Sequence, residues 1–333
     1  MKLSILDLAT IYNNETPQQT LQNSSKLVQL ADKLGYTRYW FAEHHNTKFQ
    51  MSTSPDLLSA HAAALTKNIR IGSGGIMIPN HSPLKVVENF SLLEALHPGR
   101  IDLGMGRASG TDGLTNAVLR NTNEPLTGEK IMNQLMEILA FFDREFPDDH
   151  PYKSITPSAD KSLRPELFML GSSDGGMSIA SQLGLGFAFA GQINPSIAVP
   201  MLKQYRENFK PSKYLSEPYS MLSIIVVCAE NDEEAADIAH PAELQWVKWM
   251  TGQYTSAPPT LEEARDHVYT REETQVRKEN KDKFVIGSPE SVKAQLDKLA
   301  EESGIDEVMI ANMITDKAAR HKSYELLAKE FNL

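Results

Sequence analysis

Three titratable side chains, Glu43, His44 and His45, directly follow the apolar run at residues 38–42. Imidazole has an unperturbed pKa close to physiological pH, which suits it to proton transfer. Neighbouring side chains of a strand point to opposite faces, so Glu43 and His44 cannot both face inward while the chain is extended. We therefore expect a turn to begin here. An isolated His-His pair is also compatible with a polar surface loop, so a catalytic role depends on what the other strand ends carry.

Eight short runs rich in β-branched or aromatic residues recur along the chain, with helical patterns between them. These runs are apolar throughout rather than alternating, as expected of strands that are covered on both faces. The predicted strands are residues 3–9, 38–43, 69–76, 101–106, 167–171, 186–191, 220–229 and 307–312. Eight strands alternating with helices predict an α/β fold, a parallel sheet closed into a (β/α)8 TIM barrel. An open doubly wound sheet is the alternative, but no G-x-G-x-x-G motif follows the first strand.

Helix boundaries are indicated by Ser, Thr, Pro and Gly residues. An N-cap residue followed by Pro in the first turn favours a helix start, and Gly after the last apolar residue favours a C-cap. The predicted starts are Thr16-Pro17, Ser54-Pro55, Ser82-Pro83 and Ser288-Pro289, and the predicted C-caps are Gly35 and Gly304.

The segment 251–283 is an exception, because it is polar and rich in charged residues and contains Pro258-Pro259. A long segment with little apolar surface inside a compact fold is usually a lid or a flexible excursion. A solvated helical insertion without a gating role is equally compatible with the pattern. We expect residues 1–333 to form a single barrel domain, with this insertion before the last βα units.

The composition excludes several classes of function. The 333 residues include 33 basic and 43 acidic side chains, a formal charge of −10, and no basic cluster stands out. A nucleic-acid partner would require a basic face, so we expect none. The single cysteine, Cys228, fits a reducing compartment. The sequence shows no signal-peptide pattern and no apolar run near the roughly 20 residues that span a bilayer. We expect a cytoplasmic protein without a membrane partner.

Active sites of (β/α)8 barrels lie at the C-terminal ends of the strands. These ends carry Glu43-His44-His45 after the second predicted strand, Gly74-Gly75 near the end of the third, Gly-Met-Gly-Arg at 104–107 after the fourth, and Gly-Ser-Ser-Asp-Gly-Gly at 171–176 after the fifth. Gly74 and Gly75 would let a flat group lie against bare backbone, although a β-bulge is the alternative. The pattern predicts one coherent site at the mouth of the barrel.

A phosphate site is predicted between the fourth and fifth strand ends. Arg107 is a fixed cation, and residues 171–176 lead into a helix near Met177, whose free N–H groups favour an anion. A guanidinium beside such a helix start suits a phosphate monoester. The predicted residues are Arg107, Ser172, Ser173, Gly175 and Gly176. Separately, each feature has a structural explanation, a tight turn for the loop and an ion pair for the arginine.

A flat ring with a phosphate tail describes FMN, and the whole chain resembles the bacterial luciferase-like flavin-dependent monooxygenases. The specific segments are Trp-Phe-Ala-Glu-His-His at 40–45 and His-Pro-Gly-Arg-Ile-Asp-Leu-Gly-Met-Gly-Arg at 97–107, supported by 6–8, 71–75, 170–173 and 285–289. The resemblance implies that reduced FMN from a separate flavin reductase reacts with O₂ and a small organic substrate. One oxygen atom would enter the substrate and the other would leave as water.

The resemblance also implies roles for individual residues. Glu43 would line the flavin cavity, and His44 would be the catalytic acid/base. Gly74-Gly75 would form a non-prolyl cis peptide against the ring. Arg107 with Ser172-Ser173 would bind the phosphate, and residues 251–283 would be the family's mobile loop.

Two departures limit the resemblance to the non-luminescent, single-polypeptide branch. Gly106 stands where light-emitting members carry a reactive cysteine, and Ser172 stands where they carry an acidic residue. Luminescence and a long-chain aldehyde substrate are therefore not implied.

Other functions remain as alternatives. A deazaflavin-dependent reductase on the same barrel would need more cations near the mouth than Arg107. A non-catalytic flavin-binding subunit would not need to retain His44 with Glu43. A hydrolase is disfavoured because no Gly-x-Ser-x-Gly elbow or metal-spaced histidine pair occurs, and we expect no metal site.

Two helical segments are candidates for assembly. Residues 54–66 present small side chains such as Ala63, and residues 83–96 are apolar. Packing on the barrel would explain both patterns, whereas the family resemblance implies that these helices pair two copies into a homodimer. A bulky charge, as in Ala63→Arg, would then produce a monomer or destabilise the dimer. The sequence does not identify the substrate, whose specificity we place in loops 10–16, 46–53, 80–81 and 192–194.

Overall fold

Parallel strands form the centre of the computed structural model, which describes residues 1–13, 15–253 and 256–333. The strands in these ranges are β1 (Lys2–Asp7), β2 (Arg38–Phe41), β3 (Arg70–Met77), β4 (Ile101–Gly106), β5 (Glu166–Gly171), β6 (Gly186–Ala190), β7 (Ser220–Cys228), β8 (Phe284–Gly287) and β9 (Glu307–Ala311). All of them except β8 form a ring in the order β1-β2-β3-β4-β5-β6-β7-β9, which closes where β9 pairs with β1. The predicted (β/α)8 barrel is therefore confirmed.

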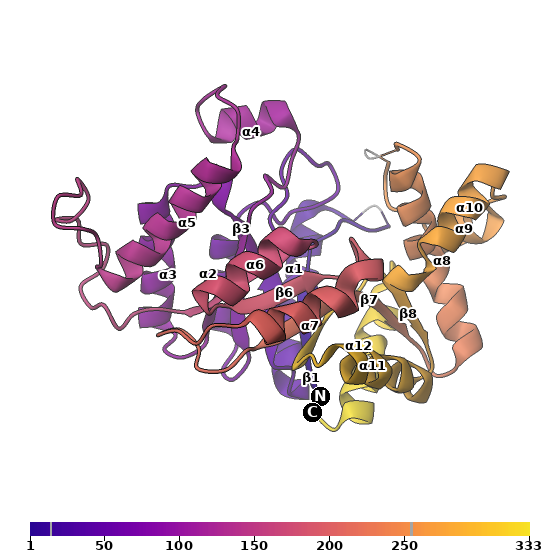
Figure 1. Ribbon diagram of the computed structural model, residues 1–333. Helices are drawn as coiled ribbons and strands as arrows, with labels where there is room; N and C mark the ends of the chain where they lie inside the picture. Colours follow the sequence, from indigo (N-terminus) through magenta and orange to yellow (C-terminus); the bar gives the residue numbers. More distant parts are fainter. Residues whose placement is uncertain (14, 254–255) are drawn as a thin grey trace.

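Helices surround this ring, and both chain termini lie at the same end of the molecule (Figure 1). The α-helices are α1 (Pro17–Leu34), α2 (Pro55–Leu65), α3 (Pro83–Leu96), α4 (Gly113–Leu119), α5 (Gly128–Asp143), α6 (Asp174–Leu183), α7 (Ala198–Asn208), α8 (Asp232–Met250), α9 (Leu261–Asp266), α10 (Arg271–Glu279), α11 (Pro289–Ser303) and α12 (Lys317–Phe331), with short 3₁₀ turns η1 (Ile78–Asn80), η2 (Pro195–Ile197) and η3 (Lys281–Lys283). Within the described ranges, none of the helices has the length and apolarity needed to cross a bilayer.

The predicted strands match the eight strands of the ring, but their ends differ. β1 ends at Asp7, before Ala9, whose φ of 46° lies in the left-handed region. β2 ends at Phe41, so the predicted strand 38–43 was two residues too long and Glu43 lies in the following turn. β8 was not predicted as a strand. It has only four residues and pairs with the C-terminal half of β7, outside the ring.

The predicted helix caps lie where the sequence placed them, with one difference. Thr16 and Gln19 form a reciprocal capping box at the start of α1, and Gly35 ends that helix in the left-handed conformation. Gly304 does the same for α11. Ser54 and Ser82 precede α2 and α3 as predicted, but their side chains make no capping hydrogen bond. Pro in the first turn is the feature that these two starts share.

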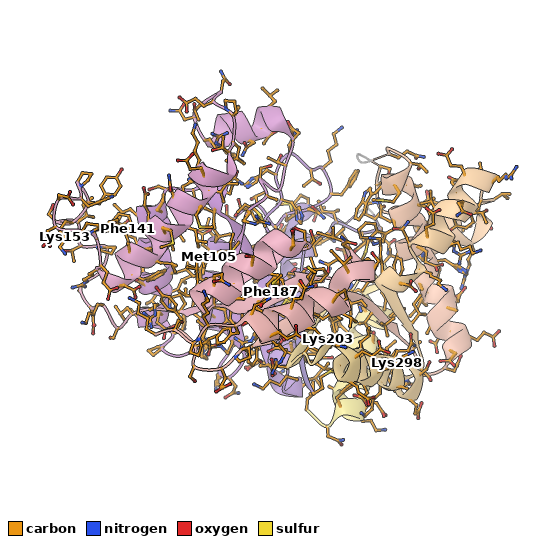
Figure 2. All side chains as sticks on the ribbon, in the orientation of Figure 1. Met105, Phe141, Lys153, Phe187, Lys203 and Lys298 are labelled. Carbon is orange, nitrogen blue, oxygen red and sulfur yellow. The ribbon has the colours of Figure 1, made fainter. Side chains whose placement is uncertain are left out.

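The main apolar core fills the layer between the strands and the helices. Met105 and Phe187 are fully buried and lie in the middle of the molecule, whereas Lys203 and Lys298 are exposed (Figure 2). This layer accounts for strands that are apolar on both faces, because one face contacts helices and the other faces the barrel interior.

The barrel interior begins with a buried layer of charges at its N-terminal end. Arg38 Nη1 lies 2.9 Å from Asp102 Oδ2 and 3.0 Å from Glu166 Oε2, and Arg38 Nε lies 3.1 Å from Glu307 Oε2. Asp102 and Glu307 are fully buried, and Arg38 is 4% exposed. Trp40 Nε1 donates to Asp102 Oδ2 at 2.9 Å. The indole therefore connects the charged layer to the apolar layer above it.

The apolar layer inside the barrel lies above these charges and consists of Leu6, Trp40, Ala42, Phe168, Ala188, Met221 and Met309. Several of these side chains, including Leu6, Trp40 and Met309, also form the floor of a cavity at the C-terminal end of the barrel. The two layers fill the lower barrel in the described part of the chain, and the cavity lies at the C-terminal end.

The segment 251–283 contains α9, α10 and η3, and its residues 254 and 255 lie outside the described ranges. Two ion pairs hold it on α8. Arg265 pairs with Asp237, and Arg277 Nη2 lies 2.5 Å from Glu243 Oε2. Figure 1 shows α9 and α10 beside α8. These contacts favour the helical insertion over a structureless loop, and its mobility and gating stay predictions.

Candidate functional site

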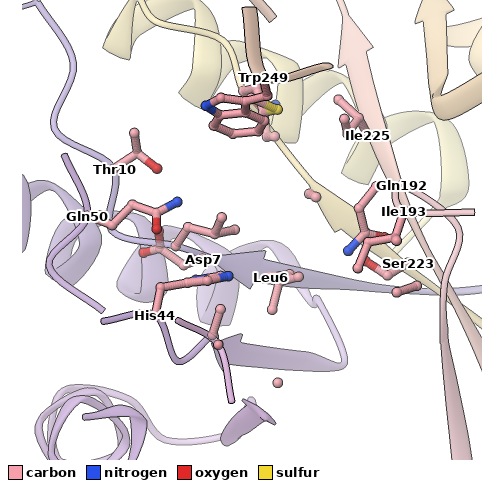
Figure 3. A pocket seen from close by; sticks show the side chains of 18 of the residues that line it. Leu6, Asp7, Thr10, His44, Gln50, Gln192, Ile193, Ser223, Ile225 and Trp249 are labelled. Carbon is pink, nitrogen blue, oxygen red and sulfur yellow. The ribbon is translucent and has the colours of Figure 1, made fainter. Parts of the chain in front are cut away.

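A cavity of about 620 Å³ lies at the C-terminal ends of the barrel strands, a volume within the roughly 300–1,000 Å³ of typical ligand pockets. Figure 3 shows His44 on one side of this cavity and Gln192, Ile193 and Ser223 on the other. The site therefore lies at the barrel mouth, where the strand ends predicted it.

His44 reaches into the cavity from the turn after β2. Its backbone N–H donates to the carbonyl oxygen of Ser52 at 2.9 Å, which fixes the turn. The ring Nδ1 is buried and has no hydrogen-bond partner among the described residues. Burial lowers the pKa of His44 below its usual value and outweighs the opposite effect of the Glu43 carboxylate. The imidazole is therefore neutral near pH 7 and can accept or donate a proton at the cavity surface.

Glu43 does not line the cavity, in contrast to the sequence prediction. Its carboxylate is fully buried behind the cavity wall. It accepts hydrogen bonds from the Met77 backbone N–H at 2.9 Å and from Asn80 Nδ2 at 2.8 Å. His45 Nε2 and His81 Nε2 each lie 2.9 Å from it. The turn directs Glu43 away from the cavity and His44 into it. The sequence indicated that only one of the two could face inward from an extended strand, but not which one.

Charge and burial oppose each other at Glu43. Burial alone would raise its pKa, but hydrogen bonds from His81, His45 and Asn80 outweigh burial and hold the pKa below its usual value. At His81 burial would lower the pKa, and the hydrogen bond and charge of Glu43 raise it instead. Glu43 and His81 thus form an ion pair that joins the end of β2 to the turn after β3.

Asn80 extends this network to the loop after β4. Its side-chain nitrogen also donates to the carbonyl oxygen of Ser109 at 2.8 Å, and its oxygen accepts from Asn116 Nδ2 at 3.0 Å. The sequence placed Asn80 and His81 in a substrate loop. In the structure neither lines the cavity, and both support Glu43 instead.

Arg107 and the start of α6 come together as the phosphate prediction requires. A Cβ atom added to Gly175 would lie 2.6 Å from both terminal nitrogens of Arg107, so the guanidinium packs on the bare backbone of the first turn. Arg107, Ser172 and Ser173 all line the cavity. Arg107 forms no salt bridge within the described part of the chain, so the alternative of a structural ion pair finds no partner there.

Gly175 and Gly176 act indirectly, because they do not line the cavity. Gly175 admits the guanidinium, and a side chain at Gly176 would lie 2.8 Å from the Cα of Gly171 and from the carbonyl oxygen of Leu170. The two glycines therefore let α6 start close to β5 and Arg107.

Gly74 and Gly75 are joined by a cis peptide bond, and the β3–β4 register shifts between Gly74 and Ile76. The cis bond implied by the resemblance and the bulge offered as its alternative thus occur at the same place. A side chain at Gly74 would lie 2.8 Å from Leu6 Cδ1 and 3.0 Å from Trp40 Cε3. Glycine is required at residue 74 because the floor is tightly packed. Gly74 also lines the cavity and Gly75 does not, so contact of a flat group with the backbone at Gly74 stays a prediction.

Comparisons with known proteins place the chain in a family. The model of the luciferase-like monooxygenase family matches residues 1–307. The uncharacterized protein YceB of Bacillus subtilis is 41% identical over 99% of this chain and 99% of its own length. The N-acetyl-S-alkylcysteine monooxygenase of the same organism is 34% identical, covering 98% of this chain and 97% of the relative. The crystal structure of apo-MsnO8 aligns with a TM-score of 0.90 at 35% identity, covering 100% of this chain and 98% of that chain.

The chain belongs to the luciferase-like monooxygenase family. The resemblance drawn from its strand ends is thereby confirmed, and the protein shares the fold of a family of oxidoreductases.

One wall of the cavity was not predicted from the sequence. Ala242, Gln245, Trp246 and Trp249 line it from α8. Their spacing of three to four residues on one helix face was the available signal. It is indistinguishable from ordinary core packing until the helix is placed over the barrel mouth. In the described ranges, no group of three or more His, Cys, Asp or Glu side chains is placed to hold a metal ion.

We expect Glu43→Gln to lower the free energy of unfolding by about 1–3 kcal/mol, because the amide cannot accept all the bonds that the carboxylate accepts. The pKa of Glu43 is lowered, so its contribution is present above the ordinary value of 4.5 and is lost as pH falls. The pKa of His81 is raised, so its contribution is present below 6.5 and is lost as pH rises through the raised value. The difference between wild type and variant should therefore be largest between these two values, measured by denaturant unfolding across pH.

The matched control is Glu301→Gln, at an exposed carboxylate on α11. A stability difference for Glu43→Gln that does not change with pH would contradict the ion-pair interpretation of Glu43 and His81.

Proposed function

We propose that this protein is a flavin-dependent monooxygenase that uses reduced FMN and O₂ to oxygenate a small organic substrate. A separate flavin reductase would supply the reduced FMN. The observation that carries the proposal is the guanidinium of Arg107, which has no salt-bridge partner among the described residues. It packs on the start of α6, in the same cavity as the neutral imidazole of His44. Membership of the luciferase-like monooxygenase family supports it.

The residues at the phosphate end of the cavity fit FMN. Arg107 provides a fixed charge, Ser172 and Ser173 provide hydroxyl groups, and the first turn of α6 provides free N–H groups. Anions bind at helix N-termini because these groups and the helix dipole both favour negative charge. The apolar floor of Leu6 and Trp40 would carry the flat ring system.

Reduced FMN, when bound, would supply the electrons with which one atom of O₂ enters the substrate and the other leaves as water. The protein itself would hold the cofactor, exclude water and move a proton at His44. A neutral imidazole whose Nδ1 has no described protein partner is suited to that exchange. Glu43 would act at a distance, by holding the turn that aims His44. The substrate named for the Bacillus subtilis relative makes N-acetyl-S-alkylcysteines the first compounds to test.

A deazaflavin-dependent reductase is the runner-up, and the charges around the cavity weigh against it. A larger, more highly charged cofactor tail would need several cations. The arginines among the described lining residues are Arg107 and Arg320. Arg320 is engaged elsewhere, since its Nε donates to the carbonyl oxygen of Ile314 at 3.0 Å and its guanidinium lies 4.7 Å from the ring centroid of Tyr12.

We predict that wild-type protein binds reduced FMN in an anaerobic titration and that Arg107→Ala weakens this binding by about 1.5–3 kcal/mol, the value of a charge-assisted hydrogen bond. Riboflavin, which lacks the phosphate, should bind both proteins equally. The control is Arg271→Ala, at an exposed arginine of α10. An equal loss of riboflavin and FMN affinity would refute the phosphate assignment.

We predict that His44→Ala keeps its affinity for flavin but slows oxygenation by roughly 10²–10⁴-fold, the usual contribution of a positioned acid or base. Stopped-flow absorbance of the flavin after O₂ is admitted, with product analysis, measures the effect. His45→Ala should slow the reaction much less, because His45 is engaged with Glu43, and should instead lower stability. Equal rate losses in the two variants would indicate a purely structural role for His44.

We also propose a homodimer formed through α2 and α3, which contact each other. Ala63 is not part of this surface. It is 1% exposed and packs in the main core, so Ala63→Arg would disrupt the fold and cannot test assembly. The exposed face instead carries Leu57 on α2, 69% exposed, and Leu92 and Leu96 on α3, 61% and 62% exposed. Apolar side chains exposed together on adjacent helices are typical of an interface.

Leu92→Arg should convert the dimer into a monomer of 37.1 kDa while flavin binding is retained. A two-fold axis brings the same surface of both copies together. The two introduced arginines would therefore lie close to each other and repel. Sedimentation measures the mass, and Val268→Arg, at a residue that is 87% exposed between α9 and α10, is the control. A wild-type monomer at micromolar concentration would defeat this proposal without affecting the flavin site.

A further inference from the structure

The buried polar atoms that line the cavity without a described partner include groups from the loop after β6, from β7 and from α8. Gln245 is 2% exposed, and neither atom of its amide group has a hydrogen-bond partner among the described residues. Ser223 is 6% exposed, and its Oγ also has no hydrogen-bond partner among these residues. Gln192 Oε1 has none either. All three side chains line the cavity. Buried polar groups in native proteins are nearly always paired with protein, ordered water or a ligand, so atoms of this kind that face a cavity mark places where a polar ligand can bind.

These groups belong to neighbouring elements. β6 pairs with β7, and the backbone N–H of Gln192 donates to the carbonyl oxygen of Ser223 at 3.2 Å. Gln245 comes from α8, which follows β7 and packs against it. Figure 3 shows Gln192 and Ser223 together, across the cavity from His44. β2 and β6 are also opposite strands of the ring.

The loop that presents Gln192 is held in place by Lys283. This lysine is 6% exposed, and its Nζ donates to the carbonyl oxygens of Gln192 and Ile193 at 3.0 and 2.5 Å. The ammonium also lies 4.7 Å from the ring centroid of Trp246. The loop that carries Gln192 is thus held in place. The ammonium group of Lys283 is already hydrogen-bonded to backbone carbonyl oxygens.

The chemistry of this cluster defines what it can bind. One hydroxyl and two carboxamides offer both hydrogen-bond donors and acceptors, and none of them carries a charge. An amide carries both a carbonyl oxygen that accepts and an N–H group that donates, which matches the donors and acceptors of this cluster. Apolar side chains surround the cluster, among them Ile193, Ile225 and Trp249.

We infer that Gln192, Ser223 and Gln245 form a recognition site for an amide group of the organic substrate, whose apolar remainder packs on Trp249 and Ile193. This inference rests on the proposed function, in which the flavin is anchored at β4, β5 and α6 and extends toward His44. That placement leaves the side formed by β6, β7 and α8 to the substrate.

The test uses FMN-loaded protein and two probes of similar shape, N-butylacetamide and butyl acetate, which lacks the N–H group. Calorimetric titration should show that the wild type binds the amide about tenfold or more tightly than the ester, because a site built for a polar group rejects the analogue that lacks it. Gln245→Leu and Ser223→Ala should each reduce this preference and leave FMN affinity unchanged. Gln204→Leu, at an exposed glutamine of α7, is the matched control.

The outcomes separate this inference from the proposed function. If wild-type protein does not bind FMN, the proposed function fails, and the same probes are titrated without flavin to judge the amide site alone. Equal binding of amide and ester, or no binding of either, overturns the inference. A loss of FMN affinity in Gln245→Leu with the amide preference intact also overturns it, because the cluster would then contact the cofactor. Ser223→Ala removes only one hydroxyl group and keeps the test valid should the leucine variant not fold.

Discussion

The buried guanidinium of Arg38 is the contact on which the barrel depends. It comes from β2 and meets Asp102 of β4, Glu166 at the start of β5 and Glu307 of β9, so it connects strands around the ring. Removing the Arg38 guanidinium would leave the buried Glu307 carboxylate without its cation, which costs several kcal/mol, roughly 3–5. The register of these strands is therefore coupled. The charged layer and the apolar layer above it fill the lower barrel in the described part of the chain, and the cavity lies at the C-terminal mouth.

A second buried charge, Glu43, connects the loops at the barrel mouth, as Arg38 connects the strands at the base. It ties the turn after β2 to the turn after β3 through His81 and Asn80, and Asn80 extends the connection to the loop after β4. Because Glu43 is committed to these donors, the next residue must face the other way. The position of His44 in the cavity is thus a consequence of where the Glu43 carboxylate finds its partners. Adjacent residues divide the work: one holds the scaffold and the other faces the ligand.

The sequence predicted the features that depend on local pattern and on the geometry common to parallel strands. Apolar runs located the ring strands, and because all their C-terminal ends meet at one edge, Arg107, Ser172 and His44 could be assigned to one site. Features that depend on distant partners could not be predicted. Arg38 and Glu307 are 269 positions apart, and no periodicity relates them. The direction of Glu43 depends on a turn whose partners lie more than 30 residues away. From the sequence alone, the α8 residues that line the cavity have the pattern of buried core residues. Their role depends on the position of the helix over the barrel.

The two ends of the cavity are built on different elements, and this arrangement has a functional consequence. Arg107 and the start of α6 belong to the β4–β5 side, whereas Gln245 and Trp249 belong to α8, with its attached excursion of α9 and α10. His44 faces the same cavity from the turn after β2. In the proposed function, a change in the α8 wall would alter which substrate is held without disturbing the contacts that hold the cofactor. In this proposal the barrel fixes the place of the chemistry, and the α8 wall selects the substrate.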